Sequence, residues 1–189
     1  DTVVEIDYET GDVVRQFADT AGTEELLLSG DTLLLLKRMS GKYNTLEGYR
    51  LTTENCWQES HRAEQAHAWN RTRKPRFIQA VSLRTGNVLW RHKTPVVPLS
   101  LAVKEQDLVF HNGDKLVCLA MTDGRERWSS GELKIQSMPT DMGAITVLYR
   151  DYALFGYPGS KTFETKQGAR RRGKCLLMNA FKLKDGSKV

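Results

Sequence analysis

The sequence has few cysteines, prolines and aromatic residues, and it contains no long apolar run. Its 189 residues include 3 Cys, 5 Pro and 8% aromatic residues. Three cysteines are too few for a disulfide-dense miniprotein, and no apolar run approaches the roughly 18 residues that a membrane-spanning helix needs. With 27% charged and 40% hydrophobic residues, the composition is that of an ordinary globular protein, which excludes a wholly disordered chain.

Four glycines, each preceded by Thr or Asp, mark an internal repeat. These are Gly11, Gly86, Gly124 and Gly186. Apolar or aromatic side chains stand five and three positions before each glycine, which is typical of a strand with one buried face. The Thr-Gly or Asp-Gly pair favours a tight turn with positive φ. Each copy is therefore predicted to be a β-hairpin, and Trp90 and Trp128 lie on the second strand of two of these hairpins.

An apolar hairpin precedes each of the last three copies, with turns predicted at residues 30–31, 105–106 and 150–151. The repeat unit is therefore four antiparallel strands. The run from Leu33 to Leu36 does not alternate with polar residues, which indicates a strand covered on both faces. The second and third glycines are 38 residues apart, close to the roughly 40–50 residues of one β-propeller blade. We expect an all-β fold, a β-propeller with about three blades in this chain.

The first and third blades are longer than the blade spacing predicts, and we assign the extra residues to two insertions. These are residues 40–76 in the first blade and 157–174 in the third. Both fall between the second and third strands of their blade, so we expect them to emerge on one face of the ring. The first insertion is predicted to contain a short helix that lays two tryptophans on the propeller. The helix also carries His61, Glu64 and His67, but steps of three residues drift around a helix by about 60° each. We therefore expect no metal site there.

Positive charge is concentrated in these insertions. Residues 40–76 carry a net charge of +3 and residues 157–174 carry +5, whereas the whole chain carries +5. A cationic face attracts anionic partners, such as a sulfated or uronic polysaccharide, a lipid headgroup or an acidic protein. Nucleic acid is disfavoured because no aromatic stacking platform accompanies the charge, and solvated loops without a ligand are the alternative. The candidate ligand-binding residues are Arg71, Arg73, Lys74, Arg76, Arg170, Arg171, Arg172 and Lys174.

The repeat resembles that of the PQQ-like (quinoprotein alcohol dehydrogenase-like) β-propellers, which reads roughly Ala-Leu-Asp-x-x-Thr-Gly-Lys-x-Leu-Trp. The best match is the segment from Ala80 to Trp90, AVSLRTGNVLW, and the next best ends at Trp128. The resemblance implies that Trp90 and Trp128 pack against the turn of a neighbouring blade and lock the blades together, with Gly86 and Gly124 in the turns. The Asp of the family's repeat is kept only at Asp7.

The family contains alcohol dehydrogenases that bind PQQ and Ca²⁺, cofactor-free outer-membrane assembly lipoproteins, and large bacterial multidomain proteins. The uneven spacing here is most similar to the last group. The dehydrogenases often carry two adjacent cysteines, whereas Cys56, Cys118 and Cys175 are separate. A Cys118–Cys175 bridge stays open as an alternative to free thiols.

The resemblance therefore implies a non-catalytic domain, without cofactor, that binds a ligand or partner in a larger periplasmic or otherwise extracytoplasmic bacterial protein. The alternative is a fragment of a dehydrogenase that uses PQQ with Ca²⁺. No nucleophile–base motif is readable, so no catalytic residue is assigned. Propellers close with about 4–8 blades. We expect the remaining blades or domains of the parent protein to complete the ring, or else partner chains.

Overall fold

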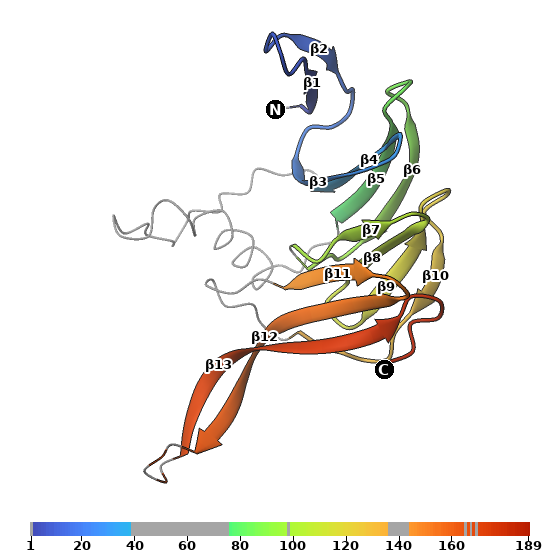
Figure 1. The fold of residues 1–189 in the computed structure, drawn as a ribbon. Helices are drawn as coiled ribbons and strands as arrows, with labels where there is room; N and C mark the ends of the chain where they lie inside the picture. Colours follow the sequence, from blue (N-terminus) through green and yellow to red (C-terminus); the bar gives the residue numbers. More distant parts are fainter. Residues whose placement is uncertain are drawn as a thin grey trace.

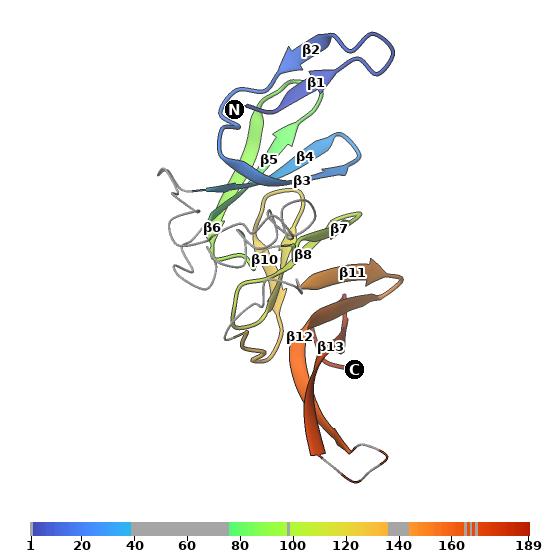
Figure 2. The same cartoon turned by 90° about the vertical axis from the view of Figure 1, so that its left-hand side faces the viewer.

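The all-β prediction is confirmed. A computed structural model describes residues 2–38, 76–97, 99–135, 144–164, 166, 168 and 170–189. These parts of the chain form thirteen strands and no helix. The strands make successive antiparallel sheets that follow one another from the N-terminal hairpin to a long ribbon near the C-terminus (Figure 1). This is a β-propeller fold, and its described blades do not close a ring (Figure 2).

Two blades are complete four-stranded sheets with strands in chain order. The first blade comprises β3 (Thr23–Ser29), β4 (Thr32–Arg38), β5 (Arg76–Ser82) and β6 (Val88–Thr94). The second blade comprises β7 (Ala102–Lys104), β8 (Asp107–His111), β9 (Leu116–Ala120) and β10 (Glu126–Ser129). The N-terminal hairpin, β1 (Val4–Ile6) and β2 (Val13–Gln16), corresponds to the last two strands of a blade. The third blade comprises β11 (Ile145–Tyr149), β12 (Tyr152–Glu164) and β13 (Arg170–Lys182).

The turns repeat from blade to blade. Gly30, Glu105 and Arg150 begin the three two-residue turns between first and second strands, with φ of 53°, 52° and 50°. Positive φ here matches the twist of the two flanking strands. The four repeat glycines share φ between 70° and 78°. Each donates its N–H to the carbonyl four residues earlier, at 2.8 or 2.9 Å. The sequence alignment of the four copies is therefore correct at the backbone.

The apolar run in β4 is buried on both faces of its sheet, as predicted. Leu33, Leu34, Leu35 and Leu36 are each at most 4% exposed. Leu33 and Leu35 pack toward the N-terminal hairpin, in a cluster with Phe17. Leu34 and Leu36 pack toward the second blade. A similar core joins the second and third blades, so each sheet forms one layer of a continuous stack.

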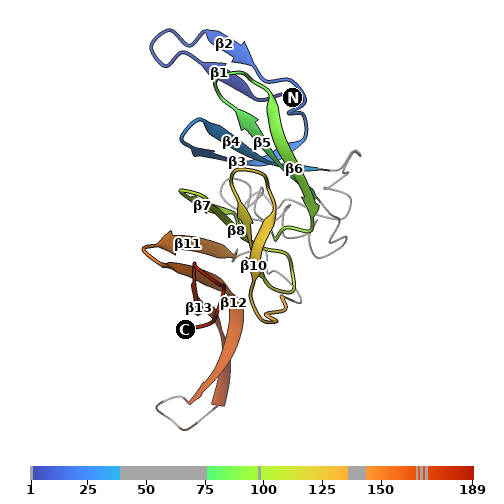
Figure 3. The same ribbon diagram turned by 90° about the vertical axis from the view of Figure 1, so that its right-hand side faces the viewer.

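The segments predicted as insertions lie between the second and third strands of their blades. Residues 39–75 connect β4 to β5, and the predicted helix with its histidines lies outside the described residues. In the third blade the extra residues do not form a separate loop. They lengthen β12 and β13, which stay paired from Tyr152↔Lys182 out to Glu164↔Arg170. The resulting ribbon projects from the stacked sheets (Figures 1 and 3). Whether the insertions share one face concerns residues 40–75, and so lies outside the described part.

Candidate functional site

The two repeat tryptophans occupy equivalent buried positions at the junctions between blades. Trp90 and Trp128 are each 8% exposed. The Trp90 Nε1–H donates to the Met121 carbonyl at 2.8 Å, and the Trp128 Nε1–H donates to the Leu183 carbonyl at 2.6 Å. Both acceptor carbonyls stand three residues before a repeat glycine of the following blade. Each indole thus joins one blade to the turn of the next.

Gly124 and Gly186 lie directly against these rings. A Cβ atom on Gly124 would lie 2.5 Å from Trp90 Cε3, and one on Gly186 would lie 2.4 Å from Trp128 Cε3. These glycines are therefore required twice, for their positive φ and for the close approach of the indole. Gly86 differs, because a Cβ there would meet nothing within 4 Å. Of the predicted locking glycines, Gly124 contacts a tryptophan and Gly86 does not.

At the junction between the N-terminal hairpin and the first blade, Arg15 stands where the tryptophan stands elsewhere. Its Nη1 donates to the Leu83 carbonyl, which stands three residues before Gly86. The Arg15 Nε also lies 3.5 Å from Glu5 Oε2, and the guanidinium carbon lies 5.7 Å from the centre of the Phe17 ring. A guanidinium therefore replaces the indole as the donor to the equivalent backbone carbonyl. The sequence repeat alone could have indicated this, because Arg15 stands at the position that a tryptophan occupies in the two middle copies.

The predicted basic residues are not brought into one site. Arg71, Arg73 and Lys74 lie outside the described residues. Arg76 is 3% exposed, and its Nε lies 2.5 Å from Glu24 Oε2. Arg76 therefore belongs to a buried ion pair, and its interpretation as part of an exposed cationic face is corrected. The physical reason is the strand register, which turns Arg76 into the sheet and toward an acidic partner on β3.

The other predicted basic residues lie on the outer part of β13. Arg170 pairs with Glu164 in the ribbon register, and its side chain is exposed. Arg171, Arg172 and Lys174 follow it along the same strand, and the structure does not describe their side chains. The backbone therefore gathers these four residues near the tip of the ribbon.

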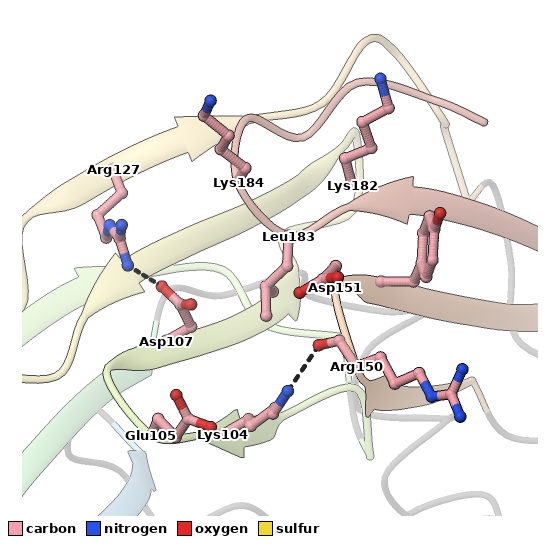
Figure 4. Close-up of a pocket in the computed structure, with 10 residues that line it drawn as sticks. Lys104, Glu105, Asp107, Arg127, Arg150, Asp151, Lys182, Leu183 and Lys184 are labelled. Atoms are coloured by element: carbon pink, nitrogen blue, oxygen red, sulfur yellow. Dashed lines mark hydrogen bonds and ion pairs between the residues drawn. The ribbon is translucent and has the colours of Figure 1, made fainter.

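A groove of about 490 Å³ lies between the second and third blades (Figure 4). Its residues Tyr152 and Lys182 pair at the opposite end of the β12–β13 ribbon from Glu164 and Arg170. Three carboxylates line the groove: Glu105, Asp107 and Asp151. Five cationic residues also line it: Lys104, Arg127, Arg150, Lys182 and Lys184. Sequence reasoning missed this groove because its residues come from separate turns and strands and form no local run.

Backbone and side-chain contacts hold the groove together. The Leu183 N–H donates to the Asp151 carbonyl at 2.7 Å, and the Leu183 carbonyl is the acceptor of Trp128. Leu183, which lines the groove, is therefore also part of the Trp128 junction. On its walls, Arg127 pairs with Asp107, and Lys104 Nζ donates to the Arg150 carbonyl at 2.6 Å (Figure 4).

Two buried titratable groups have strongly shifted pKa values. Burial lowers the pKa of His111 to about 4. Its Nδ1 accepts from the Gly113 N–H at 2.9 Å, so Nε2 donates to the Leu133 carbonyl at 2.8 Å, and the neutral ring stacks on Phe155. Burial raises the pKa of Glu25 to about 7, although a hydrogen bond from the backbone N–H of Leu99 opposes this. Both groups support loops and offer no catalytic pair.

The described thiols are unbridged. Cys118 and Cys175 are free, so the alternative of a bridge between them is not realised. Burial and the nearby Asp107 carboxylate raise the pKa of Cys118 to about 12, which makes it an unreactive core residue. Cys56 lies outside the described part. Within that part, no three His, Cys, Asp or Glu side chains are grouped to hold a metal ion, and no helix has the length and apolarity to span a membrane.

Fold and junctions together define a segment of a β-propeller. No protein-family model and no curated protein matches the sequence. Among solved structures, the chain is similar to BamB from Moraxella catarrhalis, with 13% identity and a TM-score of 0.40 over 63% of this chain. It is also similar to the N-terminal domain of Nup159, with 16% identity and a TM-score of 0.47 over 99% of this chain. The chain spans 34% and 41% of the lengths of those two chains.

Proposed function

We propose that this chain is part of a non-catalytic, PQQ-like propeller domain that binds an anionic partner within a larger extracytoplasmic bacterial protein. The PQQ-like assignment is supported by the repeat and by its physical outcome, a tryptophan of one blade on the glycine turn of the next. The binding role rests on one observation above all, the projecting cationic ribbon of the third blade.

The ribbon extends far beyond what the blade needs. β12 and β13 have 13 residues each, whereas no strand of the first two blades exceeds 7. The buried residues of β12 and β13, such as Ala153, Phe155 and Phe181, lie at the inner end of the ribbon. A two-stranded ribbon alone is marginally stable in water. A long ribbon whose segment 157–174 carries a net charge of +5 is therefore better suited to contact an anionic partner than to support the core.

Apolar faces at both ends of the stack support a larger propeller. On β3, Leu26 and Leu28 are 49% and 60% exposed and face the side of the N-terminal hairpin. On β11, Val147 and Tyr149 are 44% and 58% exposed, while Leu148 packs on the core shared with the second blade. Between the described blades such faces are covered by the next sheet. Further blades of the parent protein would cover these two in the same way.

The binding proposal is tested with a heparin-derived oligosaccharide as the polyanionic probe, titrated at low and at physiological salt. We expect saturable binding that the double variant Arg170→Glu/Arg172→Glu weakens by about tenfold or more, since a cationic patch reversed in charge repels a polyanion. The control variant Arg84→Glu/Lys93→Glu makes the same charge change at exposed positions of the first blade. Equal weakening in both variants would reduce the effect to net charge and contradict the ribbon as the site.

The non-catalytic part is tested separately, by titrating PQQ with and without Ca²⁺ and following tryptophan fluorescence. We expect no saturable quenching. Saturable quenching that depends on Ca²⁺ would contradict the proposal and favour the alternative, a PQQ-dependent alcohol dehydrogenase.

A further inference from the structure

The N-terminal hairpin and the loop that follows it are tied together by hydrogen bonds. The Val3 N–H donates to Thr20 Oγ1 at 2.8 Å, and the Phe17 N–H donates to the Val3 carbonyl at 3.0 Å. Thr20 is 0% exposed, and its hydroxyl donates to the Phe17 carbonyl at 2.8 Å. Residues 3–20 therefore form one unit, which we call the N-terminal unit.

Asp19, in the loop of this unit, is held by three polar side chains of the first blade. Lys37 Nζ lies 3.1 Å from Asp19 Oδ1 and also donates to the Asp19 carbonyl. Gln79 Nε2 donates to the same carbonyl at 3.1 Å, and Arg91 Nη2 pairs with Asp19 Oδ2. The hydrogen bond from Lys37 is the main cause that lowers the pKa of Asp19 below its usual 3.8, so the carboxylate is charged at neutral pH. Every one of these contacts crosses from the N-terminal unit to the first blade.

Lys37 is the buried charge of this network. It is 7% exposed, and Gln79 beside it is 0% exposed, whereas the side chains of Asp19 and Arg91 are 59% and 46% exposed. Of the three oxygen atoms around the Lys37 ammonium, two belong to Asp19 and one to Gln79, at 3.5 Å. A buried ammonium is costly unless a carboxylate compensates it. Lys37 therefore depends on Asp19 while the N-terminal unit is docked, and water takes over that role if the unit moves away.

The apolar part of this junction is small, which gives the charges a large share in it. Phe17 belongs to a cluster of four buried residues, whereas 11 buried residues form each of the other two cores. The network is also absent from the equivalent face of the second blade. There, in the repeat register, uncharged residues replace Lys37, Gln79 and Arg91, namely Asn112, Val117 and Ser129.

We propose that Asp19 acts as a latch: the N-terminal unit opens away from the first blade as one body while the blades stay folded, and the contact of Asp19 with Lys37 keeps it closed. Opening uncovers the face of β4 that carries Leu33 and Leu35, so this junction is the point at which the stack opens. Local opening of this kind is drawn from the least stable part of a fold. The ribbon and its basic residues take no part, so this inference goes beyond the proposed function and does not depend on it.

The test follows amide hydrogen exchange of the 189-residue chain by mass spectrometry, comparing residues 3–17 with β8 and β9. We expect residues 3–17 to exchange at least tenfold faster, on the order expected when a segment opens without global unfolding. Asp19→Asn should accelerate exchange of residues 3–17 by about a further tenfold and leave β8 and β9 unchanged, because only the docked state then holds an uncompensated buried ammonium.

Two further variants make the test specific. Asp123→Asn is the matched control, since Asp123 is also an exposed aspartate in a turn that pairs with an arginine, Arg125 at 3.5 Å, but in the second blade. It should leave exchange of residues 3–17 unchanged. Lys37→Met, added to Asp19→Asn, removes the buried ammonium and should slow exchange of residues 3–17 back toward the rate of the unaltered chain.

Four outcomes would overturn the latch. Equal exchange of residues 3–17 and of β8 and β9 in the unaltered chain would mean that the N-terminal unit does not open by itself. Equal acceleration of both parts by Asp19→Asn would mean that the network supports the whole fold. The same acceleration by Asp123→Asn would reduce the effect to loss of any surface carboxylate, and an unchanged rate on adding Lys37→Met would remove Lys37 from the mechanism.

Discussion

The tryptophan junctions and the arginine junction both attach one sheet to the glycine turn of the next, but with different side chains. In all three, an N–H of one sheet donates to the carbonyl three residues before the glycine of the next sheet. Trp90 and Trp128 also cover that glycine turn with a buried ring, whereas Arg15 leaves Gly86 open. A tryptophan junction combines a hydrogen bond with an apolar contact, whereas the arginine junction has the hydrogen bond without the ring contact. Comparing them therefore separates the two contributions to the stability of a junction. It predicts that the N-terminal hairpin is the least firmly attached part of the described stack.

The largest expected effect is the loss of a junction tryptophan. Trp128→Ala should lower the free energy of unfolding by about 3–5 kcal/mol, because a large buried side chain leaves a cavity and the Leu183 carbonyl loses its donor. Arg15→Ala should cost about 1 kcal/mol, the value of one hydrogen bond. Urea denaturation followed by circular dichroism measures both. Equal costs for the two variants would contradict the distinction between the junctions.

The next effect separates the two glycine turns. Gly124→Ala and Gly86→Ala share the strain of an alanine at φ near 70°, about 1–2 kcal/mol. Only Gly124→Ala also drives a Cβ into the Trp90 ring, which should add about 1–3 kcal/mol. The difference between the two melting temperatures or unfolding free energies is the quantity to measure. In a Trp90→Ala background the two costs should converge, and a persistent difference would show that the ring contact is not its cause.

A smaller effect distinguishes the two tryptophan junctions by pH. His111 stacks on Phe155, a member of the core cluster that contains Trp128, and its pKa falls from 6.5 to about 4 on folding. The unfolded chain therefore takes up the proton first, and stability is full above pH 6.5 and is lost as the pH falls toward 4. Glu25, which holds the Leu99 loop between the first two blades, has its pKa raised from 4.5 to about 7. Its contribution is full below pH 4.5 and is lost as the pH rises through 7.

Each shift corresponds to a change on the order of 3 kcal/mol across its window. Between pH 4.5 and 6.5 the two slopes oppose each other, so the unaltered chain should vary little there. Glu25→Gln should expose the His111 slope, with stability increasing as pH rises, and His111→Gln should expose the opposite slope. Urea denaturation across this range measures both, and unchanged slopes in either variant would exclude that residue as the source.

The local elements could be predicted from the sequence because their signals are local. Period-two apolar residues ending in Thr-Gly or Asp-Gly determine the hairpins, and the uninterrupted leucines of β4 indicate burial on both faces. Arg76 could not be placed, because its partner Glu24 is 52 residues away and the strand register decides which side it faces. The groove was missed for the same reason, since residues as far apart in sequence as Lys104 and Lys184 line one groove only when two blades stack. The polar residues of the β12–β13 ribbon show no apolar alternation, so a loop was expected where paired strands are found.

The smallest expected effect comes from replacing the arginine of the N-terminal junction with a tryptophan, as found at the other two junctions. Arg15→Trp would place an indole over the open Gly86 turn and keep a donor for the Leu83 carbonyl. The added apolar contact should raise the free energy of unfolding by about 0.5–1 kcal/mol, offset in part by the loss of the contacts of Arg15 with Glu5 and Phe17. The sharper readout is a second substitution. If the indole seats as it does at Trp90, then Gly86→Ala becomes more costly in the Arg15→Trp chain than in the unaltered one. An unchanged cost would mean that the tryptophan is not seated on the turn, and that the N-terminal hairpin approaches its neighbour at a different angle from the blades.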